Sequence, residues 1–449
     1  MMQNRKNSFV FFVACFVSLG GILYGYDMGV ISGALLFMQK DIPLTEMQTG
    51  CIVGAVLGGG LIGTLLSGPI GDLLGRRLLI LLSGVVFLLG ISFILLATDF
   101  YGLLAARLFL GVGVGVVAVA VPLYVAEMVP DQDRGRYVTF FQLLLTIGIL
   151  LAYCVDLFFS DTGNWRAMFA VLIVPSLILF VGSFFLPETP RWLLANARIE
   201  QARHVLSKIL PDEKMAAREL WRITEGLQAE ETSSWREIFS SKFLLPSLVA
   251  VAIAIFNQLT GINSFLQYAP LILKNAGLSS DMVSMAGSAG IGALNFLFTL
   301  LAITLVDGVG RRPLLLIGIV GVVISEIFLG AVDLYSQTLP NAGILSLLGL
   351  FLFIVSFAIG PGVVVWLAIS ELFPTRVRGK GVAICLFFNS LAATLLATYF
   401  LPIVKYFSMG VTYWLFAFFS LLYFVVVYFF LPETKKKSLE EIQFSFQER

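Results

Sequence analysis

Two residues of opposite charge, Asp27 and Arg107, interrupt long apolar stretches of this 449-residue chain. A charge near the centre of a bilayer costs about 2.5 to 3.5 kcal/mol or more and usually has a function. Burial and a neighbouring guanidinium act in opposite directions on the proton affinity of a carboxyl group. If the two residues pair, a balance that changes as a cavity opens would make Asp27 a proton switch. The alternative is a static buried ion pair that holds two helices together.

Side-chain amides inside apolar runs form a second set of polar groups, namely Gln142, Asn257, Gln258, Asn263, Gln267, Asn295 and Asn389. Asn263 and Gln267 share one helix face, whereas Gln258 is about 140° away from Asn263 on an ideal helix. These groups converge only if Gly261 permits a local break. Isolated amides can instead join neighbouring helices in a membrane. Amides spread over several runs favour a polar cavity.

The composition is that of an integral membrane protein. Hydrophobic residues make up 58% of the chain and charged residues 13%, against about 25% charged residues in ordinary globular proteins. The net charge of +1 provides no basic field for nucleic acid. The four cysteines and the single His204 show no disulfide or zinc spacing. No nucleotide loop, nucleophile or acid–base constellation indicates an enzyme, and no cofactor or metal is expected.

Twelve apolar runs are long enough to cross a bilayer core of about 30 Å as helices of about 20 residues. They lie near 9–37, 47–71, 78–97, 101–126, 137–160, 166–186, 243–273, 280–306, 313–335, 343–372, 381–404 and 411–431. With twelve spans, 24 basic residues fall on the side of both termini and 4 on the other side. The chain is therefore predicted to be all-α, with both termini in the cytoplasm.

A polar stretch divides the spans into six and six. Residues 191–242 contain 17 charged residues, so the predicted division is a first half (1–190), a cytoplasmic linker (191–242), a second half (243–432) and a tail (433–449). Short amphipathic helices are predicted in the linker, with one apolar face made of Ile199, Ala202, Val205, Leu206 and Ile209. A solvated spacer is the alternative.

Charged motifs recur about 240 residues apart at equivalent loops, which indicates two homologous halves. The charges of these loops are Asp72, Arg76, Arg77, Glu127 and Arg134 in the first half, and Asp307, Arg311, Arg312, Glu371 and Arg378 in the second. The string Pro187-Glu188-Thr189 likewise returns as Pro432-Glu433-Thr434. Carboxylates and guanidinium groups at helix ends can pair on one face and release, as a clamp on one conformation. Anchoring of the loops at lipid headgroups is the alternative.

These motifs resemble those of the sugar porter family of the major facilitator superfamily, which includes bacterial proton-linked symporters and facilitative glucose transporters. The resemblance covers nearly the whole chain. It rests on the loop charges above, on Arg107, and on the strings Pro187-Glu188-Thr189-Pro190-Arg191-Trp192, Gln258-Leu259-Thr260-Gly261-Ile262-Asn263 and Gly360-Pro361 with Trp366. It implies the major facilitator fold, with substrate bound between two six-helix halves.

The resemblance also implies roles for individual residues. Asp27 would carry the proton with Arg107 as its partner, whereas facilitative relatives have a neutral residue in place of the aspartate. The implied sugar ligands are Gln142, Gln258, Asn263, Asn295 and Asn389, with Trp366 stacking on the ring. Asn257 and Gln267 stand where relatives often have glutamine and tyrosine, so the motifs leave pentose, hexose and polyol open.

The function expected from these residues is import of a monosaccharide with a proton by alternating access. We expect a monomer in a bacterial inner membrane, with both termini cytoplasmic. A facilitative uniporter and a non-transporting sugar sensor are the alternatives. The run from 167 to 186 contains no acid that could serve as a second relay residue. Glu326 is expected to be the only other acid well inside a run, and either helix packing or a role in lining the cavity remains open for it.

Overall fold

The computed structural model describes residues 2–129, 131–210, 212–231, 238, 240–278, 280–339, 341–373 and 377–435. Within these ranges, twelve helices or helix pairs are long and apolar enough to cross a membrane. The predicted all-α, twelve-span fold class is therefore confirmed.

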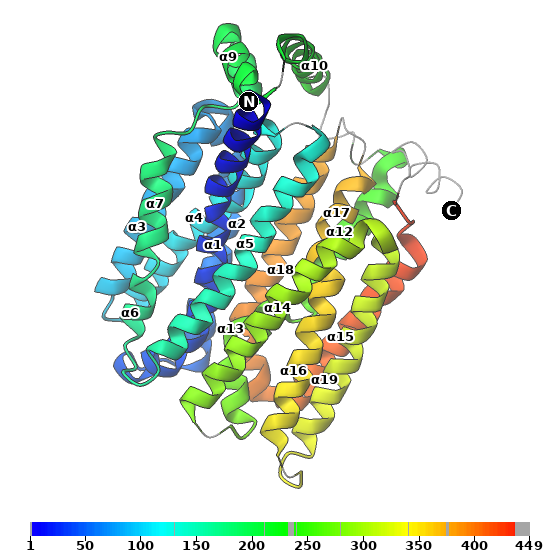
Figure 1. Cartoon of the computed structure of the whole chain (residues 1–449). Helices are drawn as coiled ribbons and strands as arrows, with labels where there is room; N and C mark the ends of the chain where they lie inside the picture. The colour runs from blue at the N-terminus through cyan, green and yellow to red at the C-terminus, as the bar shows by residue number, and fades with distance from the viewer. Residues whose placement is uncertain are drawn as a thin grey trace.

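The first group of helices runs from the N-terminus to the linker (Figure 1). It comprises α1 (Met2–Asp41), α2 (Glu46–Leu74), α3 (Arg76–Leu96), α4 (Phe100–Met128), α5 (Asp131–Phe158), α6 (Trp165–Ala170) and α7 (Ile173–Ser183). Among the described residues of the linker, the helices are α8 (Pro190–Ala195), α9 (Ile199–Ile209) and α10 (Glu213–Glu231). The second group comprises α12 (Ser241–Leu259), α13 (Ile262–Asn275), α14 (Asp281–Val309), α15 (Arg311–Leu334), α16 (Ala342–Ile359), α17 (Pro361–Leu372), α18 (Arg378–Phe407) and α19 (Met409–Phe430).

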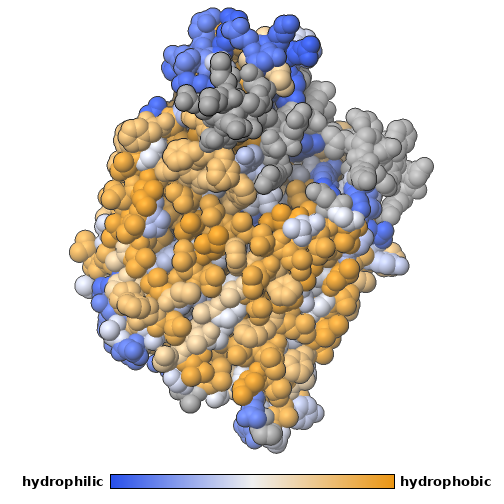
Figure 2. Space-filling model, in the orientation of Figure 1, coloured by the Kyte–Doolittle hydropathy of each residue, from blue (hydrophilic) through white to orange (hydrophobic). Residues whose placement is uncertain are grey.

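The linker helices α9 and α10 and the start of α1 lie at one end of the bundle (Figure 1). We call this the linker end, and we call the opposite end, where α1 finishes at Asp41, the distal end. Apolar side chains cover the middle of the visible face, and polar side chains gather at both ends (Figure 2). Such a belt of exposed apolar side chains is what a bilayer covers, so the belt accounts for hydrophobic residues that water would not tolerate.

Three of the spans are broken helices, and each break has a local cause. Gly261 adopts a left-handed φ of 81° between α12 and α13, a conformation that glycine adopts without steric cost. Gly360 precedes Pro361, which opens α17 at a position where its missing N–H costs nothing. The sixth span, predicted near 166–186, runs from Trp165 to Ser183 and consists of two helices. Pro175 cannot donate to the preceding turn, so α6 and α7 are separate.

The most extensive contacts between the two groups of helices are those of α1 with α13, α2 with α18, and α5 with α14. Contacts that join them lie toward the distal end. The hydroxyl of Tyr153 on α5 donates to the carbonyl of Leu266 on α13 at 2.7 Å, and Lys405 forms an ion pair with Glu46 at 2.8 Å. At Gly54 a Cβ would lie 3.1 Å from the carbonyl oxygen of Thr394, so glycine permits the close approach of α2 and α18.

The linker packs against the first group through α9, which contacts α1. Four residues of the predicted apolar face are buried in α9, and they are Ala202, Val205, Leu206 and Ile209. Ile199 does not belong to this face, because it is the first residue of the helix and its side chain is 54% exposed. Most of the predicted tail, residues 436–449, lies outside the described residues.

Candidate functional site

The structure places Asp27 of α1 and Arg107 of α4 against each other inside the first group of helices. The Arg107 Nη1 atom lies 2.6 Å from Asp27 Oδ1, and the two side chains are 1% and 0% exposed. The guanidinium also lies over the ring of Phe169 on α6, 5.5 Å from its centroid. This is the geometry of a desolvated, charge-assisted hydrogen bond.

The pair is not saturated with partners. The second oxygen of Asp27, Oδ2, and the Nε atom of Arg107 have no hydrogen-bond partner among the described residues. A buried pair is stabilised only while both charges are present, and removing one partner typically costs about 3 to 5 kcal/mol. Protonation of Asp27 would remove one of the two charges, so a proton on this carboxyl changes the stability of the contact between α1 and α4.

Three amides from the second group of helices form a hydrogen-bonded cluster at the broken span. Asn263 donates to Gln258 at 2.7 Å, and Gln258 donates to Asn389 of α18 at 3.2 Å. Asn389 in turn donates to the carbonyl of Ala254 at 2.9 Å. The left-handed break at Gly261 is what brings Gln258 and Asn263 together, since a straight helix would place them on different faces.

Two further amides sit next to the break with unused acceptors. The side-chain oxygens of Asn257 and Gln267 are buried and have no hydrogen-bond partner among the described residues. An unsatisfied buried acceptor costs about 1 to 3 kcal/mol, and a ligand hydroxyl can remove that cost. The surroundings of the amide cluster therefore suit a molecule that carries several hydroxyl groups.

The structure does not bring every expected ligand into this cluster. Gln142 on α5 and Trp366 on α17 are partly exposed, and Asn295 on α14 is buried. Among the described residues, none of the three forms a hydrogen bond with Gln258, Asn263 or Asn389. Gln142 lies in the first group of helices, whereas Asn295 and Trp366 lie in the second group with the cluster. A ligand that contacts both Gln142 and the cluster must therefore lie between the two groups.

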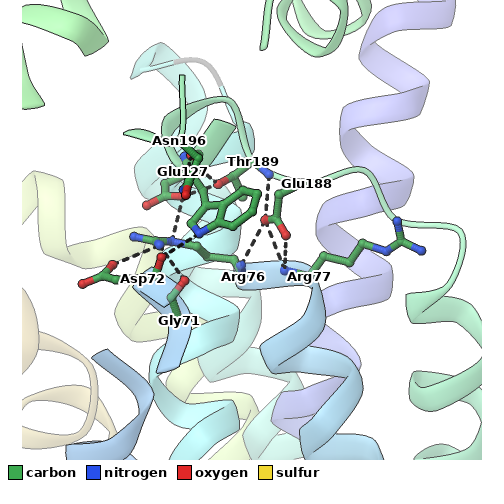
Figure 3. A network of polar contacts seen from close by, with 9 residues as sticks. Gly71, Asp72, Arg76, Arg77, Glu127, Glu188, Thr189 and Asn196 are labelled. Carbon is green, nitrogen blue, oxygen red and sulfur yellow. Dashed lines mark hydrogen bonds and ion pairs between the residues drawn. The ribbon is translucent and has the colours of Figure 1, made fainter. Parts of the chain in front are cut away.

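A network of charged side chains occupies the linker end of the first group (Figure 3). Arg76 at the start of α3 lies 3.0 Å from Asp72 and 3.3 Å from Glu127 of α4. Thr189 donates its hydroxyl to Glu127 at 2.5 Å, and the indole N–H of Trp192 donates to the carbonyl of Asp72 at 2.9 Å. The network thus fastens the linker helix α8 to the ends of three spans.

Glu188 caps the first turn of α3 within the same network. Its carboxylate accepts hydrogen bonds from the backbone N–H groups of Arg76 at 3.0 Å and Arg77 at 3.2 Å. The side chain of Arg77 points away and donates to the carbonyl of Phe184, just after α7, at 2.8 Å (Figure 3). A carboxylate at a helix N-terminus satisfies free donors and complements the helix dipole.

The second group repeats this arrangement. Glu433 accepts from the backbone N–H groups of Arg311 at 3.1 Å and Arg312 at 3.0 Å. Arg311 forms an ion pair with Glu371 of α17 at 3.1 Å, and Arg312 donates to the carbonyl of Tyr428 at 2.5 Å. Each cap follows a glycine of positive φ, 98° at Gly75 and 109° at Gly310.

The remaining predicted loop charges are placed less completely. Arg378 donates to the carbonyl of Phe373 at 3.3 Å, within its own loop. The side chains of Arg134 and Asp307 lie outside the described residues. The ion pairs of Arg76 with Glu127 and of Arg311 with Glu371 each join helices of one group. In this conformation those two pairs brace the individual halves.

Sequence reasoning missed three acidic residues that the structure makes prominent. Glu188 and Glu433 belong to repeated motifs but were given no role. Their recurrence after the sixth and twelfth spans could have indicated that both glutamates act in the same way. Glu326 was expected to be the only other acid well inside a run. Asp156, near the end of α5, was not considered, although it is 1% exposed. Glu326 itself is fully buried on α15, and its carboxylate approaches Ser420 of α19.

Comparisons with known proteins agree with this architecture. The sequence model of the family described as "Sugar (and other) transporter" matches residues 13–446. The chain is 40% identical to the glucose transporter GlcP of Staphylococcus epidermidis, over 99% of this chain and 98% of that protein. It is 34% identical to the galactose-proton symporter of Escherichia coli, over 98% of this chain and 95% of that protein.

Solved structures of one transporter superpose on the whole chain. A partially occluded, inward-open structure of the xylose transporter XylE from E. coli gives a TM-score of 0.84 at 29% identity, covering 96% of this chain and 100% of that chain. The proton:xylose symporter XylE bound to 6-bromo-6-deoxy-D-glucose gives a TM-score of 0.82 at 30% identity, covering 98% and 100%.

Proposed function

Because the chain belongs to the sugar transporter family of the major facilitator superfamily, we propose that it imports a monosaccharide together with a proton. It is a multi-pass membrane transporter and not an enzyme. The observation that carries the proton coupling is the buried pair of Asp27 and Arg107. A proton taken up by Asp27 neutralises the carboxylate, weakens its hold on Arg107 and frees α1 to move against α4.

The distribution of the basic residues indicates which end of the molecule faces the cytoplasm. We propose that the linker end faces the cytoplasm, because Arg76, Arg77 and the basic residues of the linker gather there. A proton that enters from the distal side and leaves at the linker end moves down the membrane potential. That movement supplies about 2.3 kcal/mol per 100 mV, which drives sugar uphill.

The sugar site of this proposal is the amide cluster around the Gly261 break. Gln258, Asn263 and Asn389 bond to one another, and sugar hydroxyls can replace these contacts. Asn257 and Gln267, on either side of the break, have unused acceptors for further hydroxyl groups. The names of its relatives, which transport glucose, galactose or xylose, support a monosaccharide as the substrate class.

Alternating access provides the route between the two faces. In the conformation described, contacts such as that of Tyr153 with Leu266 join the helix groups toward the distal end. We infer that this is a form closed to the distal side. Import then requires these contacts to break, so that sugar and proton enter, and to form again before both leave at the linker end.

Uptake of radiolabelled glucose, galactose and xylose into membrane vesicles tests the proposal. With an inward proton gradient, one sugar is expected to accumulate above its external concentration, and a protonophore is expected to abolish the accumulation. Equilibration to equal concentrations, with or without the protonophore, would make the protein a facilitative uniporter. Specific binding without uptake of any sugar would favour a sensor.

A further inference from the structure

Asp156 is a buried acid to which the proposed transport cycle assigns no role. It lies on α5, two residues before the helix ends at Phe158, and is 1% exposed. Its Oδ2 atom accepts a hydrogen bond from the backbone N–H of Gly33 on α1 at 3.0 Å. Its Oδ1 atom has no hydrogen-bond partner among the described residues.

The sequence of α1 makes a recess for this carboxyl group. A Cβ atom at Gly33 would lie 2.5 Å from the Asp156 side chain, so any larger residue would displace the acid. Gly29, one turn earlier, packs in the same way against Ala152, one turn before Asp156. The two helices are thus in contact along a glycine stripe, and the carboxyl group is enclosed within the seam between them.

The recess offers the carboxyl group few donors. Ser32 is fully buried beside it, but the Ser32 hydroxyl already donates to the carbonyl of Gly29 at 2.7 Å. The Ser32 hydroxyl carries one hydrogen, so while it donates to Gly29 it can only accept a hydrogen bond from Asp156. Its lone pairs then accept from a protonated carboxyl group and repel a carboxylate. In that arrangement the recess suits the neutral acid, with the backbone N–H of Gly33 as the one donor bonded to the carboxyl group among the described residues.

No described cation compensates a negative charge at this position. Among the ionisable groups on the helices packed against the recess, Tyr26 donates to Met168, Tyr153 donates to Leu266, Arg107 pairs with Asp27, Arg166 pairs with Asp41, Asp281 pairs with Lys274, and Lys40 lies over the ring of Phe37. Tyr24, also on α1, is a phenol and supplies no positive charge. An isolated carboxylate in such a site is far less stable than the protonated acid, whereas Asp27 has a guanidinium beside it.

The position of the recess connects it to the distal side. Gly33 follows Asp27 by six residues on α1, so the recess lies about 9 Å nearer the distal end than the ion pair does. Tyr153, one turn before Asp156 on α5, makes the 2.7 Å hydrogen bond to Leu266 across the two groups of helices. Opening of the distal side must break this contact, which loosens the end of α5 that carries Asp156.

We propose that Asp156 is a second proton-binding site, which must hold a proton for the distal side to close. With the distal side open, the carboxylic acid can give its proton to water and become a carboxylate. Before α5 and α13 meet again, a proton from the distal solution must return to the same oxygen. Alkaline solution on the distal side therefore holds the transporter open. This inference rests on the proposed transport function.

Sugar exchange in proteoliposomes with equal pH on both sides isolates this step. Asp27→Asn serves as the background, because an amide at this position takes up no proton, so any pH dependence of exchange that is left comes from another group. In this background, exchange of the sugar that wild type transports is expected to fall as the pH is raised. Adding Asp156→Asn is expected to keep exchange about tenfold higher at alkaline pH, since an amide mimics the neutral acid.

A matched control separates this effect from the loss of any buried acid. Glu326→Gln in the same background is expected to keep the fall at alkaline pH, because Glu326 lies in the other group of helices. Exchange that is already independent of pH in Asp27→Asn, or an identical fall with and without Asp156→Asn, would overturn the role of Asp156.

Infrared difference spectra of the purified protein give a second readout that does not depend on sugar transport. Exchange of water for deuterated water shifts the carbonyl band of a protonated carboxylic acid. Asp156→Asn is expected to remove one such band from the wild-type spectrum, whereas an unchanged set of bands would show that Asp156 holds no proton. If wild type transported no sugar, this spectrum would still decide the protonation of Asp156.

Discussion

The two halves of the molecule are alike at the linker end and different in the membrane. At the linker end, Glu188 and Glu433 each cap a helix that follows a glycine of positive φ. In the membrane, the first half buries the ion pair of Asp27 with Arg107, whereas the second half buries uncharged amides around Gly261. Under the proposed function, a repeated scaffold thus carries two different chemistries, proton binding in one half and sugar binding in the other.

The physical reason for this division is the difference in cost between a buried charge and a buried amide. A charge inside the membrane responds strongly to the loss of its partner, so it can change the energy of a conformation when a proton binds. An amide exchanges one hydrogen bond for another at small net cost. The first half is therefore suited to coupling, and the second half to reversible binding of hydroxyl groups.

The largest expected effect is on sugar accumulation. Asp27→Asn should abolish uphill transport, because a neutral side chain carries no proton and loses the drive of about 2.3 kcal/mol per 100 mV. That drive corresponds to about 50-fold accumulation for each 100 mV. Steady-state uptake of radiolabelled sugar in energised vesicles measures the loss, with exchange as the control that the variant still binds sugar. Undiminished accumulation would remove Asp27 from the mechanism.

The next effect is on stability in the first half. Arg107→Gln leaves a buried carboxylate without its cation and should lower the free energy of unfolding by about 3 to 5 kcal/mol. Asp27→Asn combined with Arg107→Gln should recover most of that loss, because no unpaired charge remains. Thermal unfolding of the purified variants makes the comparison. If the double variant were as unstable as Arg107→Gln, the loss of stability would come from packing between α1 and α4 and not from an unpaired charge.

A smaller effect is expected at the amide cluster. Gln258→Ala removes one hydrogen-bond donor and one acceptor and should weaken sugar binding about tenfold, or by about 1.4 kcal/mol. Titration of sugar against intrinsic tryptophan fluorescence measures the affinity. Gln201→Ala, on an exposed position of α9, is the matched control and should bind sugar as wild type does. A stable Gln258→Ala variant with unchanged affinity would move the sugar site elsewhere.

The smallest effect should be equal in the two halves. Glu188→Gln and Glu433→Gln each weaken a cap on two backbone N–H groups and should each cost about 0.5 to 2 kcal/mol of stability. Thermal unfolding of the two variants side by side checks this. A large loss for one and none for the other would mean that the linker end is not equivalent in the two halves.

The apolar runs and the loop charges were sufficient to predict the twelve spans, because the length of each apolar run and the positions of the basic residues can be read directly from the sequence. The break at Gly261 was foreseen, since the amides beside it could converge only across a break. The break before Pro175 was missed because the surrounding run is uniformly apolar. Ile199 was assigned to the buried face of α9, although the start of a helix often projects beyond the surface that it covers.

The depth of Asp27 and Arg107 along their spans made their pairing possible to anticipate. Contacts between a side chain and a distant backbone group could not be predicted from the sequence in this way. Glu188 caps N–H groups that precede it by more than 100 residues, and Asp156 bonds to the N–H of Gly33, 123 residues away. A side-chain pattern does not display a backbone donor, so these acids emerged only from the packed structure.

Proton movement into proteoliposomes that contain a pH-sensitive dye tests most directly whether the first half binds the proton that drives sugar transport. Wild type and Asp27→Asn would each be challenged in turn with glucose, galactose and xylose. We predict internal acidification with one sugar for wild type, and none for Asp27→Asn although that variant still exchanges the same sugar. Acidification by Asp27→Asn equal to that of wild type, or sugar exchange by wild type without any change in pH, would contradict proton coupling through the pair of Asp27 and Arg107.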